Sequence, residues 1–306
     1  MPQPTILIHG GAGTMHPDRL TPDKRASILA GLHQALAAAQ HVLAARGSAV
    51  DAVVAAVTAL EDDPNFNAGR GAVFTSAGSI EMDAAIMNGR TAQLGALAGI
   101  LGPRNPIQAA RLVMERSPHV MLAGPAALDF LRTEGLPFEP LAYFATEERR
   151  AALELFRADT APADDADRHG TVGAVALDAS GALAAATSTG GMTGKRPGRV
   201  GDTPIAGAGT WADRTCAVSA TGHGESFIRA AAAHEISARM RLANDPLATA
   251  AAAALDAVAA LGGDGGLIAL DHQGNYALPF NSRGMYRGVA RATGPTRVAI
   301  YQEDLA

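Results

Sequence analysis

The chain is poor in cysteine, in aromatic residues and in charge. Its 306 residues include one cysteine, Cys216, which excludes an intramolecular disulfide framework and suits a reducing compartment. Aromatic residues make up only 4%, so alanine, glycine, valine and leucine must supply most of the core. The net charge of −5 gives no basic field that would attract nucleic acid or an anionic membrane, and neither is expected as a partner.

Long apolar runs are also missing. No stretch of about 18 apolar residues occurs, so no membrane-spanning helix is expected. Residues 1–9 contain no basic segment followed by a long apolar one, as a secretory leader would. These observations predict a cytoplasmic protein. Hydrophobic residues nevertheless make up 48%, and we expect residues 1–306 to fold as a single domain around a sizeable core.

Apolar patterns predict alternating groups of strands and helices. Because the strands occur in hairpins and the helices in adjacent pairs, we expect antiparallel sheets covered by layers of helices. The predicted strands are residues 5–8, 72–75, 82–87, 95–100, 171–177, 183–187, 216–220, 266–270 and 276–280. The predicted helices are residues 22–46, 48–61, 106–116, 125–133, 146–157, 225–242 and 246–261.

The composition changes abruptly before residue 171. Residues 158–170 are small, acidic and proline-bearing, which predicts a mobile linker. The linker ends at Gly170, whose carbonyl is unhindered, and Thr171 begins an apolar strand. If the bond between Gly170 and Thr171 breaks, Thr171 keeps its hydroxyl and gains an α-amine with a pKa of about 7.7–8.0, so one residue supplies both nucleophile and base. By spacing alone, Thr171 is more simply explained as a β-branched residue that starts a strand.

Two hydroxyl- and glycine-rich segments could assist Thr171. Residues 187–192 end the strand that pairs with residues 171–177, so Thr189 can lie beside Thr171 and hydrogen-bond to it. Residues 219–225 follow a strand and open a helix. Backbone N–H groups there, together with the Thr221 hydroxyl, can stabilise an oxyanion.

A third segment carries opposite charges. Arg199 and Asp202 are three residues apart on a glycine-flanked loop. This pair suits a zwitterionic ligand, because Arg199 can bind an α-carboxylate in a bidentate manner while Asp202 accepts from an α-ammonium. A surface salt bridge between the two side chains explains the spacing equally well.

Taken together, several segments resemble the plant-type asparaginase and isoaspartyl peptidase family of N-terminal-nucleophile hydrolases. They are residues 9–13, 66–71, 169–178, 187–193, 197–202 and 219–225, in family order. The resemblance extends over residues 5–280. It implies hydrolysis of L-asparagine and of β-aspartyl (isoaspartyl) dipeptides, and an α+β fold that forms a four-layer αββα sandwich. It also implies self-cleavage into an α subunit, residues 1–170, and a β subunit, residues 171–306.

The resemblance assigns a role to each site residue. It implies Thr171 as nucleophile, Thr189 as its hydrogen-bond partner and Asn67 as a supporting residue. Oxyanion stabilisation would come from Thr221 and Gly222. The substrate would be held by Arg199, Asp202, Gly222 and Gly224.

A cation and an assembly are implied in the same way. The resemblance implies no cofactor for catalysis, a dimer of αβ units, (αβ)₂, and a structural sodium ion held by backbone carbonyls. The acids Asp62 and Asp63 favour a cation, although oxygen-rich loops often hold only water. In this sequence the carbonyls belong to Leu60, Glu61, Asp63, Phe66, Ala68 and Arg70.

The same residues are also compatible with two other classes of protein. An esterase would use residues 9–11 as an oxyanion turn and Ser188 as nucleophile, but no helix follows Ser188 in the expected pattern. A non-enzymatic amino-acid-binding module would use Arg199 and Asp202, and it leaves the junction at Thr171 unexplained. Both alternatives predict a chain that stays intact.

Nearby polar residues have simpler expected roles. His9 is expected to order the glycine-rich turn and to bind no metal, because no second histidine or cysteine lies at metal-ligand spacing. Glu225 is expected to stabilise the start of its helix. His223 is a candidate for the rim of the pocket.

Overall fold

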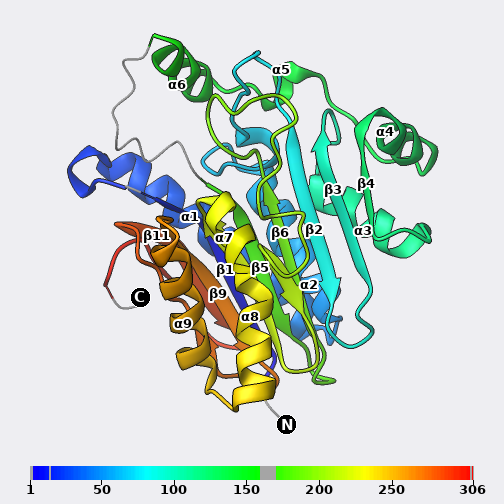
Figure 1. Ribbon diagram of the computed structural model, residues 1–306, viewed down its shortest axis with the longest axis vertical. Helices are drawn as coiled ribbons and strands as arrows, with labels where there is room; N and C mark the ends of the chain where they lie inside the picture. The colour runs from blue at the N-terminus through cyan, green and yellow to red at the C-terminus, as the bar shows by residue number, and fades with distance from the viewer. Residues whose placement is uncertain (1–2, 14, 159–169, 304, 306) are drawn as a thin grey trace.

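The computed structural model describes residues 3–13, 15–158, 170–303 and 305. It is a mixed α/β structure with two sheets (Figure 1). Most of the predicted linker, residues 159–169, lies outside the described residues. Within the part that is described, no helix is long and apolar enough to cross a membrane.

The larger sheet contains eight strands in the order β12-β11-β1-β5-β6-β2-β3-β4. Neighbouring strands pair antiparallel, except that β4 runs parallel to β3. Strands β5 and β6, which the sequence predicts as a hairpin, therefore lie at the centre of this sheet. The bounds are β1 Thr5–Gly13, β2 Met82–Asn88, β3 Leu94–Ile100, β4 Met121–Ala123, β5 Val172–Leu177, β6 Leu183–Thr189, β11 Gly284–Arg291 and β12 Arg297–Ala299.

The smaller sheet contains four antiparallel strands in the order β10-β9-β8-β7. Apolar side chains of both sheets share one buried cluster, in which Leu7 and Val175 of the large sheet pack with Ile268 and Leu270 of the small one. The two sheets therefore face each other across a common core. The bounds are β7 Thr210–Ala212, β8 Cys216–Gly222, β9 Gly265–Asp271 and β10 Tyr276–Ala277.

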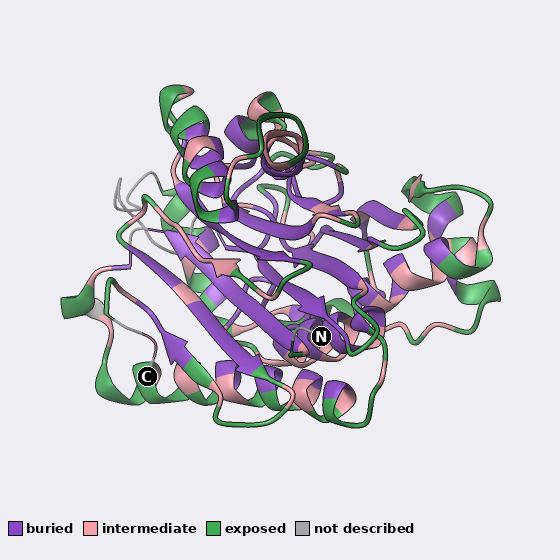
Figure 2. Ribbon diagram, turned by 90° about the horizontal axis from the view of Figure 1, so that it is seen from below, coloured by how far each residue is buried: buried purple, intermediate pink, exposed green. Residues whose placement is uncertain are grey.

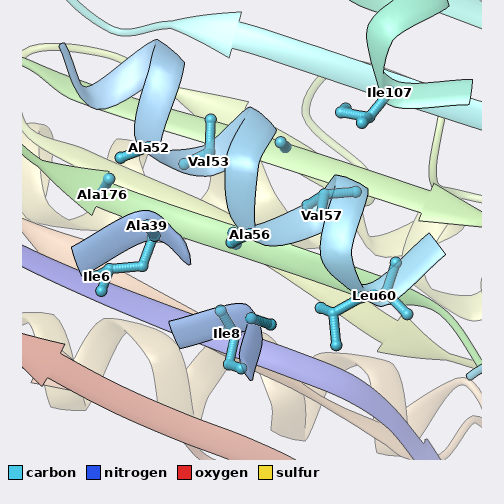
Figure 3. Close-up of a cluster of buried hydrophobic side chains, with 14 of the residues drawn as sticks. Ile6, Ile8, Ala39, Ala52, Val53, Ala56, Val57, Leu60, Ile107 and Ala176 are labelled. Carbon is cyan, nitrogen blue, oxygen red and sulfur yellow. The ribbon is translucent and has the colours of Figure 1, made fainter. Parts of the chain in front are cut away.

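Helices α1 (Pro22–Ala44) and α2 (Ala49–Asp62) cover the large sheet. Each begins at a residue whose hydroxyl accepts a backbone N–H: Thr21 accepts from Lys24 and Ser48 from Asp51. Figure 3 shows α2 lying over the sheet, with Val53, Val57 and Leu60 in the same buried cluster as Ile6 and Ile8 of β1. Small alanines in this cluster allow helix and sheet to approach closely. Helix α3 (Pro106–Arg116) packs beside them on β2 and β3.

Three helices pack on the small sheet. They are α7 (Gly224–Ala230), α8 (Ala232–Ala238) and α9 (Leu247–Ala260), and they share an apolar cluster with β8 and β9. Figure 1 shows α8 and α9 in front of the strands and α2 and α3 behind them. In Figure 2 the strands between these helices are buried along most of their length. The remaining elements are η1 (Pro17–Arg19), η2 (Gly69–Gly71), α4 (Gly124–Thr133), α5 (Leu141–Phe144), α6 (Glu147–Arg157) and η4, a π-helical turn (Arg239–Ala243).

Two predicted elements are wrong. Residues 72–75 form no strand, because the Val73 N–H donates to Asn67 Oδ1, the Thr75 N–H donates to Ser79, and only an isolated bridge joins Thr75 to Lys195. The predicted helix at residues 225–242 is broken at Ala231, which has φ +48°. The break lets the first N–H groups of α8 donate to carbonyls of Gly207 and Ala208, so a tertiary contact outweighs local helix propensity.

Candidate functional site

Thr171 and Thr189 meet at the open end of the β5–β6 hairpin. The register pairs Val172 with Ser188, which places Thr171 opposite Thr189. The Thr171 hydroxyl donates to Thr189 Oγ1 at 3.0 Å, and both side chains are buried. The predicted hydrogen bond is therefore present. Its catalytic role stays a prediction at this point.

The carbonyl oxygen of Gly170 accepts two side-chain hydrogen bonds. Asn67 Nδ2 donates to it at 2.9 Å and Thr189 Oγ1 at 2.8 Å. Asn67 is itself fixed, because its Nδ2 also donates to the Gly191 carbonyl and its Oδ1 accepts from the Val73 N–H. Two donors aimed at one carbonyl oxygen form the arrangement that stabilises an oxyanion when that carbonyl is attacked.

The glycine-rich turn of residues 9–13 runs alongside the bond between Gly170 and Thr171. A β-bulge at Gly10 shifts the register of β1 against β11. Gly11 has φ +117°, a conformation that favours glycine, and a Cβ there would stand in tight contact, 3.3 Å from the Gly170 Cα. On the other side of the bond, His9 Nδ1 donates to the Thr171 carbonyl at 2.9 Å. His9 therefore contacts the candidate nucleophile directly, which the sequence did not indicate.

Thr221 reaches the same turn from the small sheet. It lies near the end of β8, fully buried, and its Oγ1 accepts from the Ala12 N–H at 3.2 Å. Its own proton is then available for donation to a ligand. Gly222 and His223 lead into α7, with His223 at the N-cap position and half-buried.

Arg199, Asp202 and Gly224 lie together at the start of α7. A Cβ on Gly224 would stand 2.9 Å from Asp202 Oδ1 and 3.0 Å from Arg199 Nη2, so a side chain there would crowd both charged groups. Arg199 does not pair with Asp202 as the alternative interpretation supposed. Its Nε and Nη2 donate to the two carboxylate oxygens of Glu225 at 2.9 and 2.7 Å. Glu225 lies in the first turn of α7, as expected, and its carboxylate also binds the guanidinium of Arg199.

Asp202 carries a buried carboxyl group. Its side chain is 4% exposed, and within the described residues its Oδ2 has no hydrogen-bond partner. Burial raises the pKa of Asp202 to about 7. An ammonium group placed here would supply the missing donor and lower that pKa, as expected of a site for an α-amine.

Buried charged groups that the sequence did not identify tie the loop of residues 195–202 to the start of β2. Lys195 is 5% exposed and its Nζ donates to the Glu81 carbonyl at 2.8 Å, while the Glu81 carboxylate accepts from the Gly198 N–H at 2.8 Å. Asp83, whose register partner is Thr189, is also buried. Burial lowers the pKa of Lys195 and raises that of Asp83, and the attraction between the two opposes both shifts.

The loop after α2 carries the carbonyls of the predicted sodium site. Burial raises the pKa of the Glu61 carboxyl to about 8, and its Oε1 accepts from the Ile107 N–H at 2.9 Å. Asp63 Oδ1 accepts from the backbone and side-chain amides of Asn65. Within the described ranges, His, Cys, Asp and Glu side chains form no cluster of three or more that could hold a metal.

A small cavity lies beside Gly170. One cavity of about 40 Å³ is lined by residues that include Gly11, Asn67 and Gly170. That volume suits a few water molecules and is too small for an amino acid. A larger pocket of about 550 Å³ lies at the turn end of the β5–β6 hairpin, around Arg90 and Ser180, away from Thr171.

The esterase interpretation does not fit this geometry. Ser188 lies inside β6, fully buried, and no sharp turn into a helix follows it. Its neighbours in the strand, Thr187 and Thr189, point to the opposite face of the sheet.

Comparison with known proteins identifies the family. Residues 2–300 match the family model described as Asparaginase. The isoaspartyl peptidase of Salmonella typhimurium (strain LT2) is 46% identical over 99% of this chain and 100% of its own length. The Escherichia coli (strain K12) isoaspartyl peptidase is also 46% identical, over 99% of this chain and 98% of its own. An isoaspartyl peptidase/L-asparaginase of Bos taurus is 45% identical over 74% of this chain and 73% of its own.

The chain therefore belongs to this asparaginase family, as the sequence motifs predicted, and it is a hydrolase.

Proposed function

We propose that this protein hydrolyses L-asparagine to aspartate and ammonia and cleaves β-aspartyl dipeptides, using Thr171 as nucleophile after cutting itself between Gly170 and Thr171. The observation that carries the proposal is the geometry at this bond. The Thr171 hydroxyl, its partner Thr189 and two donors to the Gly170 carbonyl all surround one peptide group. Relatives named isoaspartyl peptidase and isoaspartyl peptidase/L-asparaginase support the same activities.

Self-cleavage would begin when Thr171 Oγ1 attacks the carbonyl carbon of Gly170. The new C–O bond forms as the C–N bond breaks, the nitrogen takes a proton and becomes the free α-amine, and water then hydrolyses the ester. Asn67 Nδ2 and Thr189 Oγ1 stabilise the negative oxygen during this step. Because Thr189 accepts from Thr171 and donates to the Gly170 oxygen, a proton that leaves the nucleophile has a path toward that oxygen.

Turnover would use a different set of donors. The α-amine of Thr171 acts as general base for the Thr171 hydroxyl, which attacks the side-chain carbonyl of asparagine or the β-linked peptide bond. The Thr221 hydroxyl and the backbone N–H groups around Gly222 stabilise the resulting oxyanion. Arg199 and the Gly224 backbone bind the α-carboxylate, and Asp202 binds the α-ammonium. Ammonia or the leaving amino acid departs, and water releases aspartate.

We infer an αββα sandwich of the N-terminal-nucleophile type, because one apolar cluster joins α1 and α2 to the large sheet, a second joins the two sheets, and a third joins the small sheet to α7–α9. The proposed assembly is a dimer of αβ units, (αβ)₂. Light scattering should then give twice the 31.1 kDa mass of one chain.

A sodium ion fits the loop after α2. The Leu60 carbonyl would be paired by the N–H four residues later in a continuing helix, but that residue is Pro64, which has none. The corresponding N–H for Glu61 belongs to Asn65 and donates to Asp63 Oδ1 instead. Within the described residues these two carbonyls therefore lack the usual donor four residues later. With those of Asp63, Phe66 and Ala68, each of which also accepts a backbone N–H, and that of Arg70, they would hold the ion. A bound ion would stabilise this loop, so replacing sodium by choline should lower Tm.

Assays of ammonia release test the activity directly. Asparagine should be hydrolysed and glutamine should be a poor substrate, because Arg199 and Asp202 fix the α-groups while the extra methylene moves the amide carbon by about 1.5 Å, and a misplacement near 1 Å can cost on the order of 100-fold. β-Aspartyl dipeptides should be cut and α-aspartyl dipeptides left intact. Comparable kcat/KM values for asparagine and glutamine would contradict the proposed clamp.

A further inference from the structure

Three residues form one row across the centre of the large sheet. The register pairs His9 of β1 with Gly173 of β5, and Gly173 with Thr187 of β6. The middle residue has no side chain, and a Cβ built there would overlap both Ser219 Oγ and His9 Nε2. Gly173 therefore leaves an opening between its neighbours. The hydroxyl of Ser219, from β8 of the small sheet, fills that opening.

The opening holds a buried chain of hydrogen bonds that leads from one sheet to the other. His9 Nε2 lies 2.8 Å from Ser219 Oγ, which lies 2.8 Å from Thr187 Oγ1. Thr210 Oγ1 of β7 donates to Thr187 Oγ1 at 2.6 Å. All four side chains are fully buried. At the other end of the chain, His9 Nδ1 lies 2.9 Å from the carbonyl oxygen of Thr171.

The carbonyl oxygen of Thr171, the last acceptor in this chain of hydrogen bonds, fixes which atom donates in the preceding bonds. A carbonyl oxygen only accepts, so His9 Nδ1 must carry a proton. Burial lowers the pKa of His9 to about 3, so the ring is neutral and its Nε2 accepts. Ser219 spends its single proton on Nε2 and must therefore accept from Thr187. The hydrogen bonds from Thr187 through Ser219 and His9 thus all point toward the carbonyl of Thr171. The Thr210 hydroxyl lies within hydrogen-bond distance of both Thr187 Oγ1 and the Thr203 carbonyl.

We propose that His9 is a positioning residue for the nucleophile, held by Ser219 as the Nδ1–H tautomer so that it fixes the carbonyl of Thr171. This inference rests on the proposed role of Thr171. In the intact chain, the peptide bond to Gly170 also holds Thr171. After cleavage Thr171 is a chain terminus bonded only to Val172. Among the described residues, Thr189 then holds its hydroxyl and His9 holds its carbonyl.

Loss of the carbonyl anchor would affect the chemical step rather than substrate binding. Rotation of Thr171 about its Cα–C bond would move both the hydroxyl and the α-amine, and a misplacement near 1 Å can cost on the order of 100-fold in rate. Arg199 and Asp202, which hold the substrate in this scheme, do not contact His9 through any hydrogen bond found among the described residues. KM should therefore change little while kcat falls.

Two substitutions at His9 separate positioning from general stability. Asn can place an amide N–H near the position of Nδ1, whereas Gln reaches the position of Nε2 and cannot donate to Thr171 in the same way. We expect His9→Gln to lower kcat per cleaved chain by roughly 10–100-fold with KM within about threefold, and His9→Asn to restore most of kcat. Ser219→Ala should lower kcat as well. Ser237→Ala, which removes another fully buried hydroxyl bonded to Asp213, should leave kcat unchanged.

The tautomer itself can be observed without any substitution. Nitrogen-15 NMR of histidine-labelled wild-type protein should show one neutral Nδ1–H ring that does not titrate between about pH 5 and 8, well above its lowered pKa. An Nε2–H or protonated ring for His9 would overturn the proposal, as would equal kcat values for His9→Gln and wild type. The Thr171→Ala variant distinguishes this failure from failure of the proposed function. If the variant keeps its activity, Thr171 is not the nucleophile and the proposed function itself fails.

Discussion

The guanidinium of Arg199 donates two hydrogen bonds to the carboxylate of Glu225, at 2.9 and 2.7 Å. This is the geometry with which arginine binds any carboxylate. Glu225 therefore occupies the group that we assign to the substrate's α-carboxylate. A substrate must either replace Glu225 or use the remaining Nη1 of Arg199.

Replacing Arg199 by alanine should weaken the enzyme severely. The substitution leaves the α-carboxylate of the bound substrate without its charged donor, which should cost about 2–4 kcal/mol in kcat/KM. Self-cleavage should survive, because the precursor has no free amino acid to bind. Steady-state kinetics with asparagine measure the first effect and a denaturing gel the second. A near-normal kcat/KM for Arg199→Ala would show that Arg199 does not bind the substrate.

Replacing Glu225 by glutamine should act in the opposite direction on binding. Without the competing carboxylate, Arg199 is free for the substrate, and KM should fall by roughly two- to fivefold, because partly exposed ion pairs contribute only up to about 1 kcal/mol. The value of kcat should stay close to that of wild type. Glu235→Gln is a matched control, because Glu235 lies on the next helix, α8, and forms a salt bridge with Arg239. A rise in KM for Glu225→Gln would mean that Glu225 assists binding.

The raised pKa of Asp202 predicts a pH dependence. Burial raises this pKa to about 7, and Asp202 must be ionised to bind an ammonium group. In the free enzyme kcat/KM should therefore fall about tenfold per pH unit below 7, in addition to the fall caused by protonation of the α-amine. In the complex the ammonium keeps Asp202 ionised, so kcat should show the α-amine ionisation alone. Identical pH profiles for kcat and kcat/KM would contradict the assignment.

The raised pKa of Asp202 also makes the stability of the folded protein depend on pH. A carboxyl whose pKa is raised by folding favours the folded state at low pH, and that contribution is lost as the pH rises through the folded-state pKa of about 7. Asp202→Asn removes the cost of the buried charge. Its Tm should exceed that of wild type at pH 8, and the difference should narrow toward pH 4, as thermal unfolding at the two pH values will show.

The two donors to the Gly170 carbonyl predict the phenotype of Asn67→Ala. Removal of one oxyanion-stabilising donor typically costs about 10²–10³ in rate. Self-cleavage should slow by this order, and intact chain should accumulate after expression. The time course of cleavage on a denaturing gel measures it. Asn65→Ala, two residues away and bonded to Ser27 and Asp63, is the matched control and should cleave at the wild-type rate.

Local pattern was enough to predict the contact between Thr171 and Thr189. A short turn fixes the register of the β5–β6 hairpin, so the residue that precedes one strand lies opposite the end of the other. The apolar helices and their caps at Thr21 and Ser48 follow from the same kind of local signal. The family motifs, read as a resemblance, then predicted the family that the comparisons identify.

Contacts between distant segments could not be predicted in this way. Strand β11 pairs with β1 along most of its length, although the two strands lie far apart in the sequence. No local signal indicates this pairing. The Arg199–Glu225 pair depends on how a glycine-rich loop meets a helix. The link from His9 to Thr171 depends on Gly173, whose lack of a side chain matters only once two sheets face each other.

Intact mass spectrometry of the purified protein tests the central claim most directly. A cut between Gly170 and Thr171 should convert the chain of 31.1 kDa into fragments of roughly 17 and 14 kDa, in proportion to their 170 and 136 residues, without any added protease. The smaller fragment should begin with a free threonine, and Thr171→Ala should remain one inactive chain. An uncut wild-type chain that hydrolyses asparagine at the full rate would contradict the account.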